Sequence, residues 1–282
     1  MTASQLVSDT RGNVGPMRSR VRGVELEYDL TSGGEPPLVW GHGLTSSRAR
    51  EDQGLMLDWE RLSPATTTLR YDARGHGESE LTDDPVDYSW DQLALDQLEL
   101  ATQLGINRYV AGGASMGAAT ALHAVVTAPD RIIGLLLVIP PTAWETRAEQ
   151  VDQYAKMARI LDRYGVDPLL SAAATDMVIP DPFAGRGVWE QSQSDALRAA
   201  DPARLAMVFR GAGTADFPRR EQIASIEVPT RILAWSGDPG HPVSSAAELA
   251  ELIPDAQLSI ASTWDEQRAW TDDALAFLGS FR

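Results

Sequence analysis

Gly112-Gly113-Ala114-Ser115-Met116-Gly117 is the stretch of sequence that decides the fold. It follows a short apolar run and precedes an alanine-rich helical stretch. A serine flanked by glycines between a strand and a helix matches the G-x-S-x-G pattern of a nucleophile elbow, whose sharp turn strains the serine backbone and leaves no room for side chains at positions 113 and 117. The pattern predicts Ser115 as an exposed nucleophile; the alternative is a plain glycine-rich turn.

The sequence on either side of this turn alternates between strand and helix patterns. Residues 24–30 alternate strictly between apolar and polar side chains, which is typical of a strand with one wet face, and we expect it at the outside of a sheet. Short apolar runs at 37–40, 109–111 and 132–139 indicate strands covered on both faces. Such alternation requires crossover connections, so we predict an α/β fold with a mostly parallel sheet flanked by helices.

Helix signals lie between and after these strands. Ser89 and Gln92 form the pattern of a capping box, and Gly105 is the expected stop of the helix that follows. The remaining expected elements are strands at 230–235 and 257–261 and a helix between them that Ser245 and Glu248 would cap and Pro254 would end. A final amphipathic stretch from Asp265 to Phe281 should pack back on the sheet.

The middle of the chain breaks this rhythm. Between residues 142 and 227 there are helical patterns, as at Val151, Tyr154, Ala158 and Leu161, but no convincing strand. The segment from Val178 to Gly187, rich in proline and glycine, indicates a loop. The domain prediction is a core of residues 17–141 and 228–282, a helical lid of residues 142–227 and a polar N-terminal arm of residues 1–16.

Two further motifs end the buried strands that precede Ser115. They read Trp40-Gly41-His42-Gly43-Leu44 and Tyr71-Asp72-Ala73-Arg74-Gly75-His76-Gly77-Glu78-Ser79. Together with the elbow, and in this order, they resemble the α/β-hydrolase superfamily, particularly its lid-bearing esterases, enol-lactonases and haloperoxidase-like members. The resemblance covers nearly everything from Arg18 onward and implies the α/β-hydrolase fold with a helical lid inserted after the central strands.

The resemblance also implies roles for particular residues. The backbone N–H groups of Leu44 and Met116 would form an oxyanion hole for the charge that develops when an ester carbonyl is attacked. His42 and His76 would be structural. The catalytic acid is expected just after the strand that follows the lid, where Asp238 stands; the alternative is an ordinary turn residue before proline.

The departure from the superfamily pattern is the base. The superfamily places its histidine in the loop after the last strand, but that loop reads Ser262-Thr263-Trp264-Asp265, and no histidine follows position 241. Because Asp-Pro-Gly-His suits a type II turn, Asp238 could orient His241. His241 is then either a relocated base that reaches Ser115 or a turn residue near the pocket mouth. Asp265 is a weaker candidate base.

Substrate contacts are expected from aromatic residues. Trp144 lies a few residues after a central strand, and Trp264 stands where the histidine is missing. We predict both as substrate-binding residues. The lid carries further apolar side chains that could roof a hydrophobic pocket, namely Met157, Met177, Phe183, Trp189, Met207, Phe209 and Phe217.

Composition narrows the classes of partner. The net charge of -16 would repel nucleic acid and anionic membranes, so we expect a small-molecule partner, with no nucleic acid and no membrane; the alternative is that the acidity only keeps the protein soluble. The apolar side chains of the lid indicate that this small molecule is hydrophobic. The chain has no cysteine, which excludes a thiolate nucleophile and cysteine-ligated metal. Residues 1–16 show no apolar run of a signal peptide, so a cytoplasmic protein is the expectation.

Three functions follow from these observations. The first is a cofactor-free serine hydrolase, without a metal, that acts on a carboxylic ester or lactone through an acyl-enzyme at Ser115. The missing late histidine motivates the second, a non-hydrolytic isomerase, lyase or cyclase that uses the same pocket and oxyanion hole. The third is a ligand-binding protein on a hydrolase scaffold.

Overall fold

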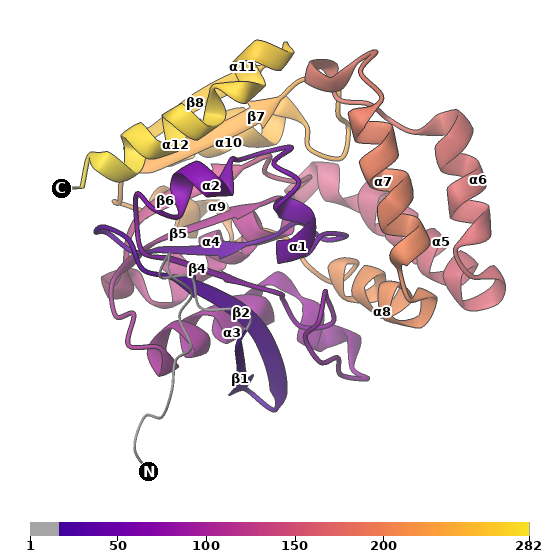
Figure 1. The fold of residues 1–282 in the computed structure, drawn as a ribbon, viewed down its shortest axis with the longest axis horizontal. Helices are drawn as coiled ribbons and strands as arrows, with labels where there is room; N and C mark the ends of the chain where they lie inside the picture. Colours follow the sequence, from indigo (N-terminus) through magenta and orange to yellow (C-terminus); the bar gives the residue numbers. More distant parts are fainter. Residues whose placement is uncertain (1–16, 282) are drawn as a thin grey trace.

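The computed structural model describes residues 17–281, so the predicted N-terminal arm, residues 1–16, lies outside the described residues. Within them one sheet of eight strands has the order β1-β2-β4-β3-β5-β6-β7-β8 (Figure 1). The strands are β1 Met17–Val21, β2 Val24–Thr31, β3 Leu38–Gly41, β4 Thr68–Tyr71, β5 Tyr109–Ala114, β6 Ile132–Val138, β7 Thr230–Trp235 and β8 Ala256–Ala261. β1, β2 and β4 pair antiparallel and all other neighbours pair parallel. The predicted mostly parallel α/β sheet is confirmed.

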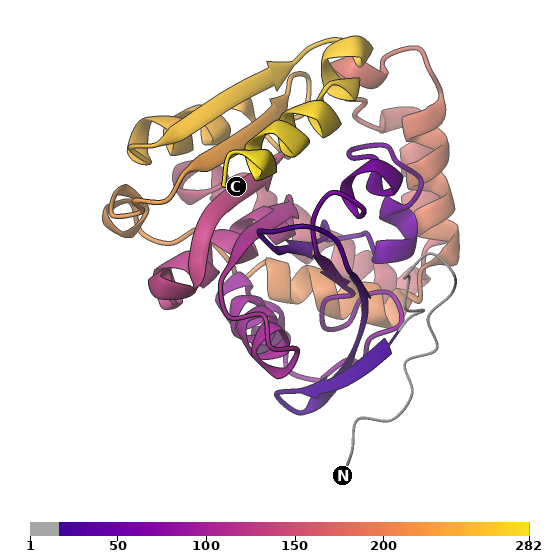
Figure 2. The same cartoon turned by 60° about the vertical axis from the view of Figure 1, so that its left-hand side comes forward.

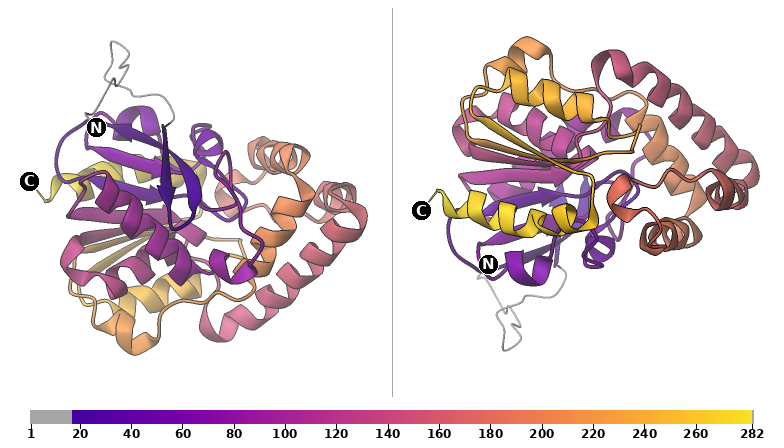
Figure 3. Two further views of the ribbon diagram at one scale, coloured as in Figure 1. Left: turned by 90° about the horizontal axis from the view of Figure 1, so that it is seen from below. Right: turned by 90° about the horizontal axis from the view of Figure 1, so that it is seen from above.

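Helices cover both faces of this sheet, as Figures 2 and 3 show. One buried cluster contains Val39 and Ala111 with side chains of α3 (Trp90–Gln103), α4 (Met116–Thr127) and α10 (Val243–Leu252). The other contains Leu38, Trp40 and Val110 with side chains of α2 (Trp59–Leu62) and α12 (Trp270–Gly279). Successive residues of β3 and β5 thus enter opposite cores, because side chains alternate along a strand. This is why these strands are apolar throughout.

The chain between β6 and β7 forms α5 (Arg147–Tyr164), α6 (Asp167–Asp176), α7 (Val188–Ala199), α8 (Pro202–Ala212) and α9 (Arg220–Ala224). α5, α6, α7 and α8 stand together beside one end of the sheet (Figure 1), and we call these four the inserted helices. Buried Arg147 at the start of α5 donates to the carbonyl oxygens of Ala212, the last residue of α8, and Ala215 in the segment after α8. α9 packs on α4 and α10 of the core. The lid boundaries of 142–227 stay a prediction.

Shorter helices complete the chain. They are α1 (Arg48–Glu51), α11 (Trp264–Arg268) and the 3-10 turns Pro85–Tyr88, Pro129–Arg131, Trp144–Thr146 and Asp181–Phe183, the last inside the predicted loop of residues 178–187. In the described part of the chain no helix has both the length and the apolar character needed to cross a membrane.

Three local predictions were wrong. β2 is not outermost, because the short charged strand β1 pairs with its free edge. The Ser89 hydroxyl contacts Val86 and the carboxylate of Asp91 in place of a capping box. α10 begins at Val243, so Ser245 lies inside the helix and caps nothing. The final amphipathic stretch packs back on the sheet as predicted, in two helices, α11 and α12, that meet at Ala269.

Candidate active site

Ser115 stands at the turn between β5 and α4 with φ 52° and ψ -109°, a backbone conformation that L residues rarely adopt. Glycines make this turn possible. A Cβ on Gly113 would lie 2.2 Å from the carbonyl carbon of Gly117, and one on Gly117 would lie 1.9 Å from the carbonyl oxygen of Gly41. The first turn of α4 can therefore press against the end of β3 and hold the serine at the carboxyl edge of the sheet.

Two backbone N–H groups come from the residues next to this serine. Met116 directly follows Ser115 in the chain, and Leu44 belongs to the loop after the neighbouring strand β3. Within residues 17–281 neither N–H donates to a protein acceptor. That of Met116 is free because it opens α4, where the first amides of a helix have no partner inside the helix. Of the two residues, Leu44 lines the cavity at Ser115.

Two buried histidines shape the loop that carries Leu44. The His42 ring accepts from the N–H of Ala73 at 3.0 Å and contacts the carbonyl oxygen of Gly43 at 2.7 Å. The His76 ring contacts the carbonyl oxygen of Leu44 at 2.6 Å. Burial lowers the pKa of His42 and lowers that of His76 to about 4. Burial thus favours the neutral form of both rings, and their hydrogen bonds to the backbone hold the loop in place.

His241 lies between Ser115 and Asp238. Its Nε2 is 2.8 Å from Ser115 Oγ and its Nδ1 is 2.8 Å from Asp238 Oδ2. The turn that brings it there is closed by a hydrogen bond from the N–H of His241 to the carbonyl oxygen of Asp238, 3.2 Å. The turn is not the predicted type II, because that type needs a positive φ at Gly240, which is not among the positive-φ glycines.

Asp238 is held by three donors. Trp235 Nε1 donates to Oδ2 at 3.0 Å, the N–H of Gly240 donates to Oδ1 at 2.9 Å, and His241 Nδ1 contacts Oδ2. Burial alone would raise the pKa of Asp238, but the charge interaction with His241 and these hydrogen bonds outweigh burial and leave the pKa below its ordinary value. The carboxylate is therefore ionised at neutral pH and fixes the His241 tautomer that carries its proton on Nδ1.

The loop after β8, where the superfamily pattern expects a histidine, caps a helix. Thr263 Oγ accepts from the N–H of Glu266, and the Glu266 carboxylate accepts from the N–H groups of Ser262 and Thr263. Asp265 is exposed on α11 and has no contact with Ser115 or His241. The structure therefore does not bring Asp265 to the site.

The two tryptophans predicted to bind substrate lie elsewhere. Trp144 packs edge-on against Phe217 and donates from Nε1 to the carbonyl oxygen of Pro218. Trp264 packs against Phe183, with the guanidinium of Arg186 over its ring. Neither lines the cavity at Ser115. Both residues are close in sequence to the expected site, but each side chain packs against other residues away from the cavity.

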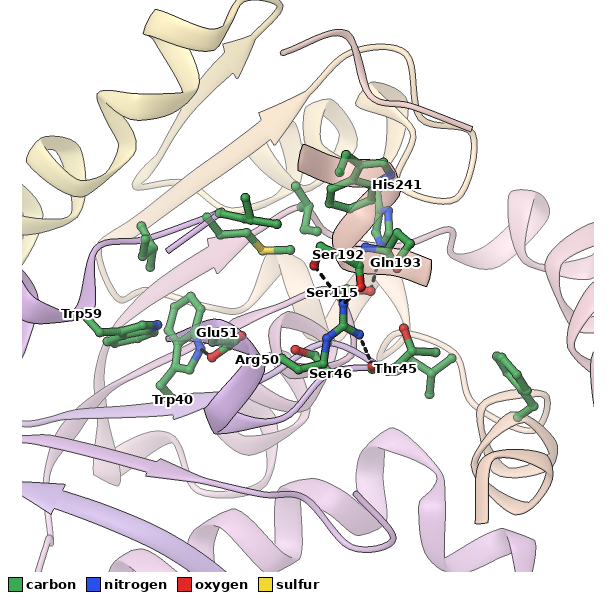
Figure 4. Close-up of a pocket in the computed structure, with 18 of the residues that line it drawn as sticks. Trp40, Thr45, Ser46, Arg50, Glu51, Trp59, Ser115, Ser192, Gln193 and His241 are labelled. Atoms are coloured by element: carbon green, nitrogen blue, oxygen red, sulfur yellow. Dashed lines mark hydrogen bonds between the residues drawn. The ribbon is translucent and has the colours of Figure 1, made fainter. Parts of the chain in front are cut away.

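A cavity of about 290 Å³ opens at Ser115 and His241 (Figure 4). The inserted helices contribute Tyr154, Met157, Trp189, Ser192, Gln193 and Phe209, and the core contributes Trp40, Gly43, Leu44, Thr45, Ser46, Arg50, Glu51, Leu55, Met56, Leu57, Trp59 and Ile139. Of the apolar side chains expected from residues 142–227, Met157, Trp189 and Phe209 reach it. Most of the lining is apolar.

The core side of this cavity was missed by sequence reasoning. Arg50 and Glu51 belong to no motif of the sequence, but α1 places both at the cavity wall. Arg50 donates to the carbonyl oxygen of Thr45 at 2.6 Å and to the backbone and side chain of Ser192 on α7. The only available signal was their position, shortly after the His-Gly turn. Among the described residues no three His, Asp or Glu side chains gather as a metal site.

The alpha/beta hydrolase family model matches residues 36–274. A putative carbamate hydrolase RutD from Pseudomonas savastanoi pv. phaseolicola is 27% identical over 225 residues, which are 79% of this chain and 83% of the relative. The enol-lactonase of Burkholderia xenovorans LB400 superposes with a TM-score of 0.78 at 24% identity and covers 93% of this chain and 100% of its own.

A thermophilic esterase from Thermogutta terrifontis superposes with a TM-score of 0.77 at 19% identity, over 94% of this chain and 97% of its own. Because both solved structures are less than 25% identical to this chain, they support the fold alone. The family model spans both strand-end motifs, the Ser115 turn and the Asp238 turn. The chain therefore belongs to the alpha/beta hydrolase family.

Proposed function

We propose that the protein is a cofactor-free serine hydrolase that cleaves a carboxylic ester or lactone of a hydrophobic small molecule through an acyl-enzyme at Ser115. The observation that carries the proposal is the 2.8 Å contact between Ser115 Oγ and His241 Nε2. A serine hydroxyl is a weak nucleophile unless a base lies within hydrogen-bonding reach, and here one does.

Acylation would begin with attack of Ser115 Oγ on the ester carbonyl carbon while His241 Nε2 takes the hydroxyl proton. The negative charge that develops on the carbonyl oxygen would be received by the N–H groups of Leu44 and Met116. As the tetrahedral intermediate collapses, the bond to the alcohol oxygen breaks and Nε2–H protonates that oxygen. For a lactone the alcohol stays attached as part of the acyl chain.

Deacylation would repeat these steps with water. His241 Nε2 takes a proton from the water, whose oxygen attacks the acyl carbon, and the proton then returns to Ser115 Oγ as the acid leaves. The ionised Asp238 carboxylate stabilises the imidazolium formed in each half-reaction through the 2.8 Å contact with Nδ1.

The position of His241 also bears on the alternative, a non-hydrolytic enzyme. That alternative was motivated by the missing late histidine, and a base at Ser115 removes the reason for it. The apolar walls formed by Leu57, Ile139 and Phe209 support a hydrophobic acyl or alcohol group. A cytoplasmic location and the absence of nucleic-acid and membrane partners remain predictions.

A fluorophosphonate probe tests the nucleophile. The expected result is one adduct, located on Ser115 by mass spectrometry of peptides, that is absent in Ser115→Ala and much slower to form in His241→Ala. Hydrolysis of p-nitrophenyl butyrate by the wild type should likewise disappear in Ser115→Ala. Full turnover of such esters by Ser115→Ala, or an adduct at another serine, would overturn the proposed function.

A further inference from the structure

Glu51 is a carboxyl group that lines the cavity and has no part in the steps above. It ends α1, whose inward turn brings it beside Trp40 and Trp59. Figure 4 shows these three side chains together, apart from Ser115 and His241. A substrate that reaches from the serine into this part of the cavity would meet Glu51 with the portion remote from the bond that is cleaved.

The contacts of Glu51 leave one oxygen open. Trp40 Nε1 donates to Oε2 at 2.8 Å. Within residues 17–281 no Arg, Lys or His forms an ion pair with this carboxyl, and no donor contacts Oε1. Oε1 is not among the fully buried polar atoms that lack a partner, and Glu51 lines the cavity. A bound molecule can supply the hydrogen-bond partner that this oxygen lacks among the described residues.

The surroundings of Glu51 favour its neutral form, chiefly through burial. Burial, the largest influence, raises its pKa to about 8, while the Trp40 hydrogen bond and Arg70 of β4 lower it less than that. Asp52 and Asp72, which follow α1 and β4, raise it further. The neighbouring Arg50 has its guanidinium engaged by Thr45 and Ser192. A neutral carboxyl whose carbonyl oxygen accepts from Trp40 holds its proton on the open oxygen.

We propose that Glu51 is a specificity-determining residue, whose carboxyl donates a hydrogen bond from Oε1 to an acceptor oxygen, such as a ketone, in the part of the substrate remote from the cleaved bond. The proposal rests on the proposed function. The Glu51 proposal adds one polar group to the hydrophobic substrate, an acceptor oxygen that lies at Glu51 Oε1. The alternative is a substrate with an ammonium group at this place, which would require Glu51 to be ionised.

Matched p-nitrophenyl esters distinguish a ketone from an ammonium group as the partner of Glu51. Hexanoate and 5-oxohexanoate differ by a ketone near the chain end, and 6-aminohexanoate compared with heptanoate tests a cation. We expect a kcat/KM for 5-oxohexanoate about threefold to tenfold above that for hexanoate at pH 6.5, as one hydrogen bond provides. The preference should fall as pH rises through about 8, because ionised Glu51 is no longer a donor.

Two variants and a control sharpen the test. Glu51→Gln keeps both an acceptor for Trp40 and a donor, so the ketone preference should persist but lose its change near pH 8. Glu51→Leu should abolish the preference. The control is Glu60→Gln, an exposed glutamate of α2 that does not line the cavity, and it should behave as the wild type does.

The outcomes are distinct. Equal kcat/KM for hexanoate and 5-oxohexanoate in the wild type, or a preference that Glu51→Leu retains, overturns the Glu51 proposal and leaves the serine hydrolase standing. Preference for 6-aminohexanoate over heptanoate that Glu51→Gln destroys overturns it in favour of a cation site. Absence of Ser115-dependent cleavage overturns the proposed function; binding of 5-oxohexanamide and hexanamide to Ser115→Ala, measured by calorimetry, then still tests the ketone preference.

Discussion

His241 Nε2 lies 2.8 Å from Ser115 Oγ, although His241 belongs to the turn after β7 and not to the loop after β8. The acid and the base of the proposed site therefore come from one four-residue turn that begins at Asp238. A single short segment sets both the Asp238 to His241 contact and the reach of the ring to the serine. Mutations in this turn should affect catalysis far more than stability.

His241→Ala should lower kcat/KM for a p-nitrophenyl ester by at least about 10³-fold, because the serine loses the base that takes its proton. Added imidazole should restore part of the loss by occupying the vacated space. His123→Ala is the control: this partly buried histidine contacts the carbonyl oxygen of Asp216, away from the cavity, so kcat/KM should stay near wild type. A loss below tenfold in His241→Ala would exclude His241 as the base.

Asp238→Asn should lower kcat by about 10³-fold to 10⁴-fold, because an amide can donate to Nδ1 and thereby favour the wrong tautomer of His241. Trp235→Phe removes one of the three donors to Asp238 but keeps the carboxylate, so its loss should stay below about tenfold. Steady-state kinetics on both variants give the comparison. Equal losses in the two would mean that Asp238 acts only as a packing residue.

Much of the fold could be predicted because its signals are local. The three strand-end motifs contain glycines that a positive φ or a close approach requires, and the Gly117 to Gly41 contact is such an approach. β1 was missed because its sequence, Met-Arg-Ser-Arg-Val, gives little apolar pattern and gains its strand from pairing with β2. The predicted helix caps were wrong where tertiary packing sets a different first residue of the helix, as at Val243 in α10.

The site was predictable in part for the same reason. Asp238 and His241 are three residues apart, so turn geometry alone brings them together. The contact of His241 with Ser115 spans 126 residues, and only the folded sheet edge creates it. Trp144 and Trp264 show the converse: closeness in sequence to the expected site says nothing about which way a side chain turns. Glu51 could not be found, because its position shortly after the His-Gly turn does not reveal that α1 faces the cavity.

Gly117→Ala should destabilise the fold by about 2–4 kcal/mol, because its Cβ would sit 1.9 Å from the carbonyl oxygen of Gly41 and neither backbone can move without disturbing β3 and β5. Gly279→Ala is the matched control, since nothing lies within 4 Å of the Cβ it would add. Urea unfolding of both variants measures the difference. Equal midpoints would show that the turn at Ser115 relaxes freely.

Glu51→Gln should change how stability depends on pH. The pKa of Glu51 is about 8 in the folded protein and near its ordinary 4.5 in the unfolded chain, so the folded state binds more protons between these values. The stability that neutral Glu51 contributes is full below pH 4.5 and is lost as pH rises through about 8. Glutamine stays neutral and keeps an acceptor for Trp40.

The melting temperature of Glu51→Gln relative to the wild type should therefore rise from pH 5 to pH 8.5. Glu60→Gln, on the exposed surface of α2, should follow the wild-type curve at every pH. Differential scanning calorimetry across this range measures both differences. Parallel curves for Glu51→Gln and wild type would mean that Glu51 is ionised in the folded protein, and the hydrogen-bond donor proposed for the cavity would then be absent at neutral pH.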